Sequence, residues 1–348
     1  MKNLKKVIWA VLLLGLAIMA VFSWYVYQAV LSPNTAFTNN EAHIYIATDA
    51  GFETVMADLK PLLKDADSFR SLAKQKGYNN NIKAGHYVLT NGMNNNDIIN
   101  TLRVRNLPIK IKFNNQERLE NLAGELAGQI EPDSISLLNA MKDKQFLADN
   151  GFDADNAIAM YLPNTYEVYW NTSAASFCDR MLIEYKKFWT EERISKAKEL
   201  GLSPEGVISL AAIVQKETAK VDERPRVAGL YVNRIKQNML LQADPTVIYA
   251  KKKAEDDFDQ AIKRVLYRDL ELDSPYNTYK YQGVPPGPIS MPDISSINAV
   301  LNYEKHDYLF MVANVQNPGY HKFAKSLAQH NRNRAEYVRW INSQGVIR

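Results

Sequence analysis

Cysteine is almost absent from this sequence: Cys178 is the only one among 348 residues, so no disulfide can form within the chain. Cys178 follows Phe177 in a segment with a helical apolar pattern, where a buried structural thiol is favoured over a nucleophile. The five histidines are scattered, and no Cys/His cluster has metal-ligand spacing. The sequence therefore predicts neither a metal site nor a cofactor.

A strong excess of one charge sign is absent too. The formal net charge is +4, with 23% charged and 46% hydrophobic residues, which is ordinary for a globular protein. No basic run is interleaved with aromatic residues, so nucleic acid is excluded as a partner. The length suffices for two soluble domains plus a membrane anchor.

Charge is missing altogether from residues 7–26, a nearly continuous apolar run interrupted by Gly15 and Ser23. Twenty helical residues span about 30 Å, the thickness of the hydrocarbon core of a bilayer. Three lysines precede the run, and no charge follows it before Glu41. The positive-inside rule therefore predicts a cytoplasmic tail of residues 1–6 and a body on the outer, periplasmic face of the membrane.

A cleaved signal peptide is the alternative, since it also combines a charged start with an apolar stretch. The run is long for a signal peptide, and Trp24, Tyr25 and Tyr27 resemble an interfacial aromatic belt. We expect an uncleaved, single-pass anchor over residues 7–27 in the cytoplasmic membrane.

Polarity patterns divide the rest of the chain into three parts. Residues 28–42 predict a short tether, and residues 106–348 a larger, mainly helical α+β domain. Between them, residues 43–105 alternate strand and helix patterns and predict a small α/β domain. Its expected strands lie at 43–48 and 82–89, and its expected helices at 52–63, 69–76 and 98–102.

The larger domain has an expected order of its own, and the predicted fold class is α+β with a single N-terminal transmembrane helix. Its elements are a strand at 109–113, a helix at 116–129, helices over 133–200 with a strand-and-turn insertion at 162–170, a helical hairpin from 203 with its second helix starting near Pro225, turn-rich chain from Tyr249 to Pro292, a strand at 308–312 and a closing helix at 327–341.

Glu217 is the residue whose position is most telling. A helix beginning after Ser203, a good N-cap, places Leu210, Ile213 and Val214 on its apolar face. Glu217 lies seven, four and three positions after them, so it continues that face. Burial favours the neutral carboxyl, which is the state a general acid needs. The alternative is a glutamate at a helix end, half exposed or paired with a neighbouring lysine.

Six short segments around Glu217 and after it carry a family resemblance. They are IVQKET at 213–218, the stretch 224–234 ending in VNR, LQADPTVIY at 241–249, YNTY at 276–279, GVPPGPI at 283–289 and LAQHN at 327–331. In order and spacing they resemble the YceG/MltG-like family of endolytic murein transglycosylases. The resemblance extends over about residues 40–340. It departs from the family at Gln215, usually glutamate, and at Asn164, where a carboxylate is usual, so Asn164 is assigned no ionic role.

The resemblance implies that Glu217 is the catalytic acid and base of a peptidoglycan lytic transglycosylase. Glu217 would protonate the leaving oxygen of the β-1,4 bond between N-acetylmuramic acid and N-acetylglucosamine. It would then act as base on the C6 hydroxyl, closing a 1,6-anhydro ring without water. Nascent glycan strands are the implied substrate, and the glycan-polymerising machinery, such as a penicillin-binding protein, the implied partner.

The resemblance also implies domain identities. Residues 43–105 resemble a LysM-like domain, which could bind glycan, act as a spacer or dock a partner. Residues 106–348 correspond to a YceG-like catalytic domain.

Further residues are candidate substrate contacts. Gln242 offers a donor and an acceptor to sugar groups. The segment 276–279 combines flat rings with hydrogen-bonding tips, which suit a sugar, although a turn with two core tyrosines is the alternative. The complete set is Gln242, Asp244, Thr246, Tyr276, Asn277 and Tyr279.

Three other carboxylates could assist Glu217. Asp222 and Glu223 are expected to cap the second helix of the hairpin, where negative charge favours the exposed amides. Asp244 precedes Pro245, which biases it to extended backbone, and a structural and a substrate-facing role are equally open for it.

Two other functions stay open. One is a hydrolytic muramidase with Asp244 as second carboxylate. The other is a non-catalytic glycan-binding or scaffold protein, against which the apolar setting of Glu217 argues, since a binder has no need to desolvate it.

Overall fold

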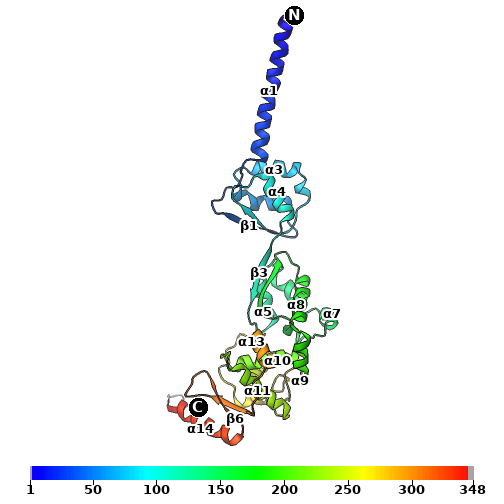
Figure 1. Ribbon diagram of the computed structural model, residues 1–348. Helices are drawn as coiled ribbons and strands as arrows, with labels where there is room; N and C mark the ends of the chain where they lie inside the picture. Colours follow the sequence, from blue (N-terminus) through cyan, green and yellow to red (C-terminus); the bar gives the residue numbers. More distant parts are fainter. Residues whose placement is uncertain (1, 344–348) are drawn as a thin grey trace. The chain divides into compact units, whose positions relative to one another are not determined.

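A computed structural model describes residues 2–343, which fall into two units (Figure 1). The first unit holds the chain up to residue 111, with 129–132 and 166–173; the second holds the remainder. The ends of the predicted ranges 1–6 and 106–348, namely Met1 and residues 344–348, lie outside the described residues.

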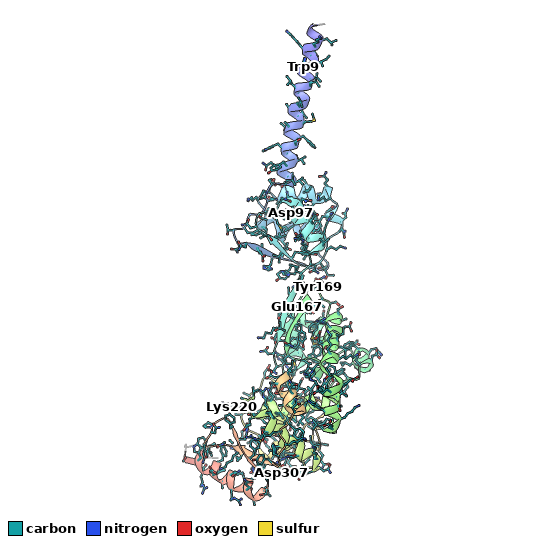
Figure 2. All side chains as sticks on the ribbon, in the orientation of Figure 1. Trp9, Asp97, Glu167, Tyr169, Lys220 and Asp307 are labelled. Atoms are coloured by element: carbon teal, nitrogen blue, oxygen red, sulfur yellow. The ribbon has the colours of Figure 1, made fainter. Side chains whose placement is uncertain are left out.

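The chain begins with a long apolar helix, α1 (Lys2–Val30). Within it, Leu4–Val30 is long and apolar enough to cross a membrane, with a mean hydropathy of 2.4, and its most apolar stretch of 18 residues has no buried residue. Trp9, for example, projects freely from the helix and is 66% exposed (Figure 2). Such exposure of apolar side chains is typical of a segment whose solvent is lipid. The predicted anchor, residues 7–27, lies inside this helix.

The first unit is built on an antiparallel pair of strands, β1 (Glu41–Ile46) and β2 (Gly85–Thr90). Their register pairs Glu41 with Thr90 and Ile46 with Gly85. The alternation of β1 buries Ile44 and Ile46 and leaves Tyr45 on the outer face.

Helices cover the inner face of this pair: α2 (Phe52–Leu59), α3 (Ala66–Gln75) and α4 (Asn95–Val104), with short 3-10 turns at Lys60–Leu62 and Tyr78–Asn80. Asp65 caps α3 by accepting from the backbone amides of Asp67 and Ser68. Leu59, Phe69, Leu89 and Ile98 are fully buried members of one apolar core. Each expected strand and helix of 43–105 is present, with bounds shifted by a few residues.

The segment predicted as a tether, residues 28–42, differs from that expectation. The helix α1 continues to Val30, and Asn34 and Thr35 are buried against the first unit. The Asn34 carboxamide donates to the Asp65 carbonyl (2.8 Å) and to Asn95 Oδ1 (2.6 Å) and accepts from the Asp65 amide (2.8 Å). Polar composition suggested free chain, but these side chains satisfy buried polar groups instead.

The second unit starts with strands β3 (Pro108–Phe113) and β4 (Asn164–Tyr169), which form a two-stranded sheet and lie partly in each unit. Between and after them come short helices, as the pattern of residues 116–200 predicted. They are α5 (Leu119–Ala127), α6 (Ser134–Met141), α7 (Lys144–Asp149), a 3-10 turn (Ala157–Met160), α8 (Ala174–Phe188) and α9 (Glu191–Glu199).

The helix α10 (Pro204–Glu217) is central to this unit. All eight residues from Val207 to Val214 are buried, because α9, α11 (Arg224–Lys236), α12 (Asp244–Glu255) and α13 (Ile294–Leu301) pack around it. Ser203 accepts from the Gly206 amide at 3.1 Å, which confirms the predicted cap. The hairpin of α10 and α11 is also as expected.

The chain after α11 departs from the prediction in four places. Asp244 was expected in extended backbone, yet it begins α12, because Pro245 needs no amide partner in a first turn. The looser stretch expected from Tyr249 begins only after Glu255. The helix α13 and the strand β6 (His321–Ala324) were not predicted. β6 pairs with β5 (Phe310–Ala313), and α14 (Leu327–Ser343) packs on both.

The buried carboxamide of Asn34 yields a test of the fold. We expect Asn34→Ala to weaken the first unit by about 2–3 kcal/mol, because it leaves buried partners such as Asn95 Oδ1 unsatisfied. Hydrogen exchange of the β1 and β2 amides in the full chain measures this loss. Asn40→Ala is the matched control, since Asn40 is exposed and should change protection little; equal effects would refute the assignment.

Candidate active site

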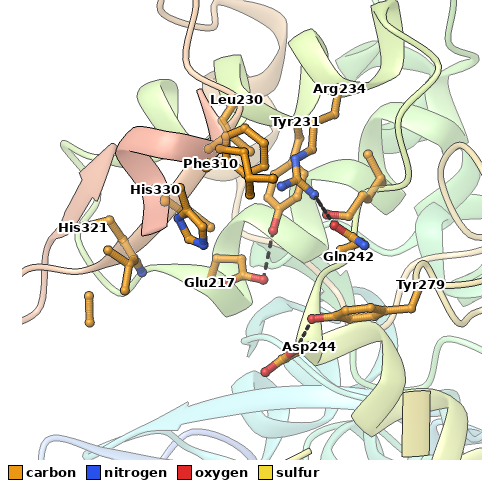
Figure 3. A pocket seen from close by; sticks show the side chains of 15 residues that line it. Glu217, Leu230, Tyr231, Arg234, Gln242, Asp244, Tyr279, Phe310, His321 and His330 are labelled. Carbon is orange, nitrogen blue, oxygen red and sulfur yellow. Dashed lines mark hydrogen bonds between the residues drawn. The ribbon is translucent and has the colours of Figure 1, made fainter. Parts of the chain in front are cut away.

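A cleft of about 400 Å³ opens at the C-terminal end of α10 (Figure 3). Its walls come from α10, α11, the start of α12, the 276–279 turn, the β5–β6 hairpin and α14. The lining residues are Glu217, Leu230, Tyr231, Arg234, Leu241, Gln242, Asp244, Tyr279, Phe310, Met311, Val312, Ala313, His321, Leu327 and His330.

Glu217 is the last residue of α10, and its carboxylate is the group at the centre of the cleft wall (Figure 3). Thr218 ends the helix in extended backbone, with its amide bonded to the Val214 carbonyl. Glu217 keeps part of its surface open to the cleft, while protein surrounds the carboxylate closely enough to remove most of its water. This burial raises the pKa of Glu217 to about 7. The predicted neutral carboxyl is thus available near neutral pH.

Groups around Glu217 adjust its ionisation in both directions. Tyr231 donates its hydroxyl to Glu217 Oε1 at 2.9 Å, which favours the carboxylate and lowers the pKa that burial has raised. The charge of Arg234 also lowers this pKa, as does that of His321 when its ring is protonated, whereas the charge of Asp244 raises it. Because burial is the largest of these effects, the pKa stays raised.

Arg234 places a cation in the cleft wall that is only 7% exposed. Its Nε donates to the Leu309 carbonyl (2.7 Å) and its Nη1 to the Leu241 carbonyl (2.8 Å). These bonds join α11 to the residue just before β5 and to the segment that precedes α12. Arg234 Nη1 also contacts Gln242 Oε1 at 3.3 Å, and Gln242 has a positive φ of 52°. The buried guanidinium therefore fixes the shape of one cleft wall.

Three of the six predicted substrate contacts line this cleft: Gln242, Asp244 and Tyr279. Tyr279 donates its hydroxyl to Asp244 Oδ1 at 2.6 Å, as Figure 3 shows. Asp244 is exposed and leaves its second oxygen toward solvent. It is the only carboxylate besides Glu217 among the cleft-lining residues that the structure describes.

The other three predicted contacts lie beneath the cleft instead. Asn277 is fully buried; its amide donates to the carbonyls of Leu270 (2.9 Å) and Leu272 (2.8 Å), and its oxygen accepts from the Tyr279 amide. It therefore shapes the turn that carries Tyr279 and does not line the cleft. Asn277 was expected to contact substrate because its motif suits a sugar, but its side-chain amide donates to two backbone carbonyls instead.

Thr246 and Tyr276 are likewise structural. Thr246 is fully buried, with its hydroxyl bonded to the Ala243 carbonyl (2.7 Å) and 2.8 Å from the Thr278 hydroxyl. Tyr276 is 1% exposed and directs its hydroxyl to Asp155 Oδ1 at 3.2 Å. Neither lines the cleft.

Glu223 and Asp222 were predicted to cap α11, but neither side chain does so. Glu223 occupies the N-cap position, but its side chain makes no capping bond. It accepts from the backbone amide of His321 (2.6 Å), from His321 Nδ1 (2.9 Å) and from the Thr218 hydroxyl (2.8 Å). Asp222 accepts from the Tyr320 hydroxyl at 3.0 Å. Both carboxylates are thus used to hold the β5–β6 hairpin against the end of α10.

Sequence reasoning missed several groups of the cleft. Tyr231, Arg234 and His321 were given no role. Spacing on α11 could have indicated Tyr231 and Arg234, which lie three residues apart on one face. His321 has no such signal, since its strand reaches the cleft through tertiary folding alone. Among the residues that the structure describes, no group of three or more His, Cys, Asp or Glu could hold a metal ion.

The fold and cleft define the class: a mixed α+β protein with an N-terminal apolar helix and a mainly helical unit that carries a cleft with a half-buried glutamate. A sequence model of the YceG-like family matches residues 44–336. The chain belongs to this family.

Relatives of known name support the assignment. A Bacillus subtilis (strain 168) protein named endolytic murein transglycosylase is 28% identical over 329 residues, covering 89% of each chain. A Streptococcus pneumoniae (serotype 2, strain D39) protein of the same name is 28% identical over 361 residues, covering 94% of this chain but 64% of the relative. A crystal structure of a YceG-like protein from Listeria monocytogenes is 27% identical, with a TM-score of 0.55, covering 85% of this chain and 99% of that one.

The opposite placements of Asn277 and Gln242 yield a test. We expect Asn277→Ala to cost about 2–4 kcal/mol of stability, because it removes a buried carboxamide with three backbone bonds. Gln242→Ala, at an exposed cleft position, should leave the melting temperature nearly unchanged. Thermal denaturation of the full chain in detergent compares the two. A Gln242 variant less stable than the Asn277 variant would contradict these roles.

Proposed function

We propose that this protein is an endolytic murein transglycosylase whose general acid and base is Glu217. The observation that carries the proposal is a half-buried carboxyl with a pKa raised to about 7 by burial, at the wall of a cleft. The names of the relatives in Bacillus subtilis and Streptococcus pneumoniae support the substrate class, murein. The bond cleaved is then the β-1,4 link between N-acetylmuramic acid and N-acetylglucosamine.

The chemistry follows from one proton that leaves and returns. Neutral Glu217 donates its proton to the glycosidic oxygen as the bond from that oxygen to C1 breaks, and positive charge develops on the sugar ring. The C6 hydroxyl oxygen of the same sugar bonds to C1, and its proton passes to the Glu217 carboxylate. The products are a 1,6-anhydro end and a free hydroxyl end, with no water consumed.

The setting of Glu217 suits both halves of this cycle. Burial makes the neutral acid available at the start, because it penalises the charged form. Tyr231 donates its hydroxyl to Oε1 of Glu217. The proton of the neutral acid is therefore carried by the other oxygen, Oε2, which does not contact Tyr231. When the proton leaves, the same donor and the nearby Arg234 charge stabilise the carboxylate.

A hydrolytic muramidase is the second candidate, because Asp244 lines the same cleft as Glu217. In that reaction Asp244 would position a water, and two carboxylates would share the work. Its bond from Tyr279 leaves one oxygen for this purpose. The single-carboxylate mechanism is favoured because Asp244 is exposed, whereas the carboxyl of Glu217 is buried enough for its pKa to be raised to about 7.

We further propose that the helix α1 anchors the enzyme in the cytoplasmic membrane, with the body on the periplasmic face. The long apolar run and the lysines that precede it support this orientation. The first unit, which spans the predicted LysM-like range 43–105, would then lie next to the membrane where new glycan strands emerge. A glycan polymerase, such as a penicillin-binding protein, is the partner that this location favours.

Replacement of the acid tests the proposal directly. We expect Glu217→Gln to reduce cleavage of uncrosslinked glycan strands by about a thousandfold or more, because the amide has no proton to donate. Mass spectrometry of the products of the full-length enzyme should show ends lighter by one water than reducing ends, and these should vanish in the variant.

Asp244→Asn separates the two candidate reactions. A transglycosylase that relies on Glu217 keeps forming anhydro ends in this variant. Reducing ends from the wild-type protein, lost on Asp244→Asn, would instead identify a muramidase. Folded wild-type protein that binds strands but cleaves none would favour a glycan-binding function.

The pH profile tests the pKa of the acid. Activity should fall as the pH rises above about 7, since the proton-donating form of Glu217 is lost there. Tyr231→Phe removes a bond that favours the carboxylate, so it should raise the pKa and move this alkaline limb to higher pH. The position of the limb in kcat/KM is the measurement. A shift to lower pH would contradict the assigned donor.

A further inference from the structure

A buried carboxylate stands behind the cleft without touching it. Glu223 is 4% exposed, and each of its oxygens accepts hydrogen bonds. Oε1 takes the backbone amide of His321 (2.6 Å), while Oε2 takes His321 Nδ1 (2.9 Å) and the Thr218 hydroxyl (2.8 Å). Burial opposes the charge of Glu223, but these bonds outweigh it and lower its pKa, so the carboxylate is ionised.

This arrangement fixes the imidazole of His321. A carboxylate only accepts, so Nδ1 carries the proton of this hydrogen bond, and in the neutral tautomer Nε2 is then the free nitrogen. His321 lines the cleft together with Glu217, and both are seen there in Figure 3. Within residues 2–343, no hydrogen bond to Nε2 is formed, and this nitrogen is left for a ligand.

The same bonds tie His321 to the acid. Thr218 directly follows Glu217 and ends α10, and its hydroxyl donates to the carboxylate that holds His321. The Lys220 amide donates to the Thr218 hydroxyl oxygen at 3.1 Å, which orients that hydroxyl. Glu217 and His321 are therefore held in one network, although they are 104 residues apart in the chain (321 − 217).

The proposed reaction needs a hydrogen-bond acceptor for the C6 hydroxyl at a stage when Glu217 cannot supply one. While Glu217 is still the acid, its proton is committed to the glycosidic oxygen, so it offers the C6 hydroxyl no free base. Two other acceptors in the cleft are engaged, Gln242 Oε1 by Arg234 and Asp244 Oδ1 by Tyr279, which leaves Asp244 Oδ2 as the competing acceptor. The Nε2 of His321 is a free acceptor that is also held rigidly.

We infer that His321 is a second catalytic residue of this cleft and that Glu223 is its positioning residue. This inference rests on the proposed transglycosylase function. His321 Nε2 accepts a hydrogen bond from the C6 hydroxyl of the muramyl sugar and holds that oxygen toward C1. The C6 oxygen then bonds to C1 as the glycosidic bond breaks, and its proton passes to the Glu217 carboxylate. His321 thereby directs the sugar ring to close before water attacks.

The product ratio tests this role, because a merely structural residue would leave it unchanged. We expect His321→Ala in the full-length enzyme to slow formation of anhydro ends by about a hundredfold, since a misplaced reacting group costs about that much. Water then captures more of the activated sugar, so the fraction of reducing ends rises. Mass spectrometry of glycan-strand digests gives both quantities from one sample.

Two further variants keep the test sharp if His321→Ala is unstable. Glu223→Gln retains the size of the side chain but cannot accept all three bonds, so it should raise the reducing-end fraction by a smaller amount. Asp222→Asn is the matched control: it removes a neighbouring negative charge that contacts Tyr320 and not His321, and it should leave the ratio unchanged.

The possible outcomes are distinct. An unchanged ratio in folded His321→Ala and Glu223→Gln, with only a lower rate, overturns the inference and leaves the transglycosylase proposal intact. A ratio that changes in Asp244→Asn but not in the His321 variant assigns the hydroxyl contact to Asp244 and also overturns it. Wild-type enzyme that yields only reducing ends refutes the proposed function, and the inference with it.

Discussion

The removal of water from one carboxyl group is the constraint on which the rest of the second unit depends. The helix α10 is buried on all sides from Val207 to Val214, so its end can meet solvent only where the surrounding elements part. Glu217 is the last residue of this helix and is partly buried with it, and this burial raises its pKa to about 7. A more open cleft would leave an ordinary carboxylate. A fully closed one would leave an acid that no glycan could reach.

Buried polar groups hold this degree of opening constant. Asn277 and Thr246 bond to backbone carbonyls beneath the cleft, Arg234 joins α11 to the residue just before β5, and Glu223 holds His321. Asn277, Thr246 and Glu223 are not among the residues that line the cleft, so a substrate can enter without breaking their buried bonds. Buried bonds of this kind cost little conformational entropy during a reaction, because they are already formed before substrate binds.

Prediction from sequence succeeded where the physics is local. The spacing of Glu217 from Leu210, Ile213 and Val214 follows from helix geometry, and so did the hairpin of α10 and α11. Prediction failed where the direction of a side chain is set by partners that are brought close only by the tertiary fold. The composition of YNTY suits sugar, but it cannot tell that Asn277 turns inward toward Leu270 and Leu272. Likewise the bias of a residue before proline was outweighed when Asp244 began a helix.

The junction between α1 and the first unit has a mechanical consequence. The Asn95 carboxamide donates to the Ala29 carbonyl in the last turn of α1, and Val30 packs against the core of this unit. A helix held in this way cannot swivel independently of the fold that follows it. In the membrane-anchored enzyme proposed above, any tilt or rotation of α1 would be transmitted to the first unit, so the thickness of the membrane would affect how that unit is oriented.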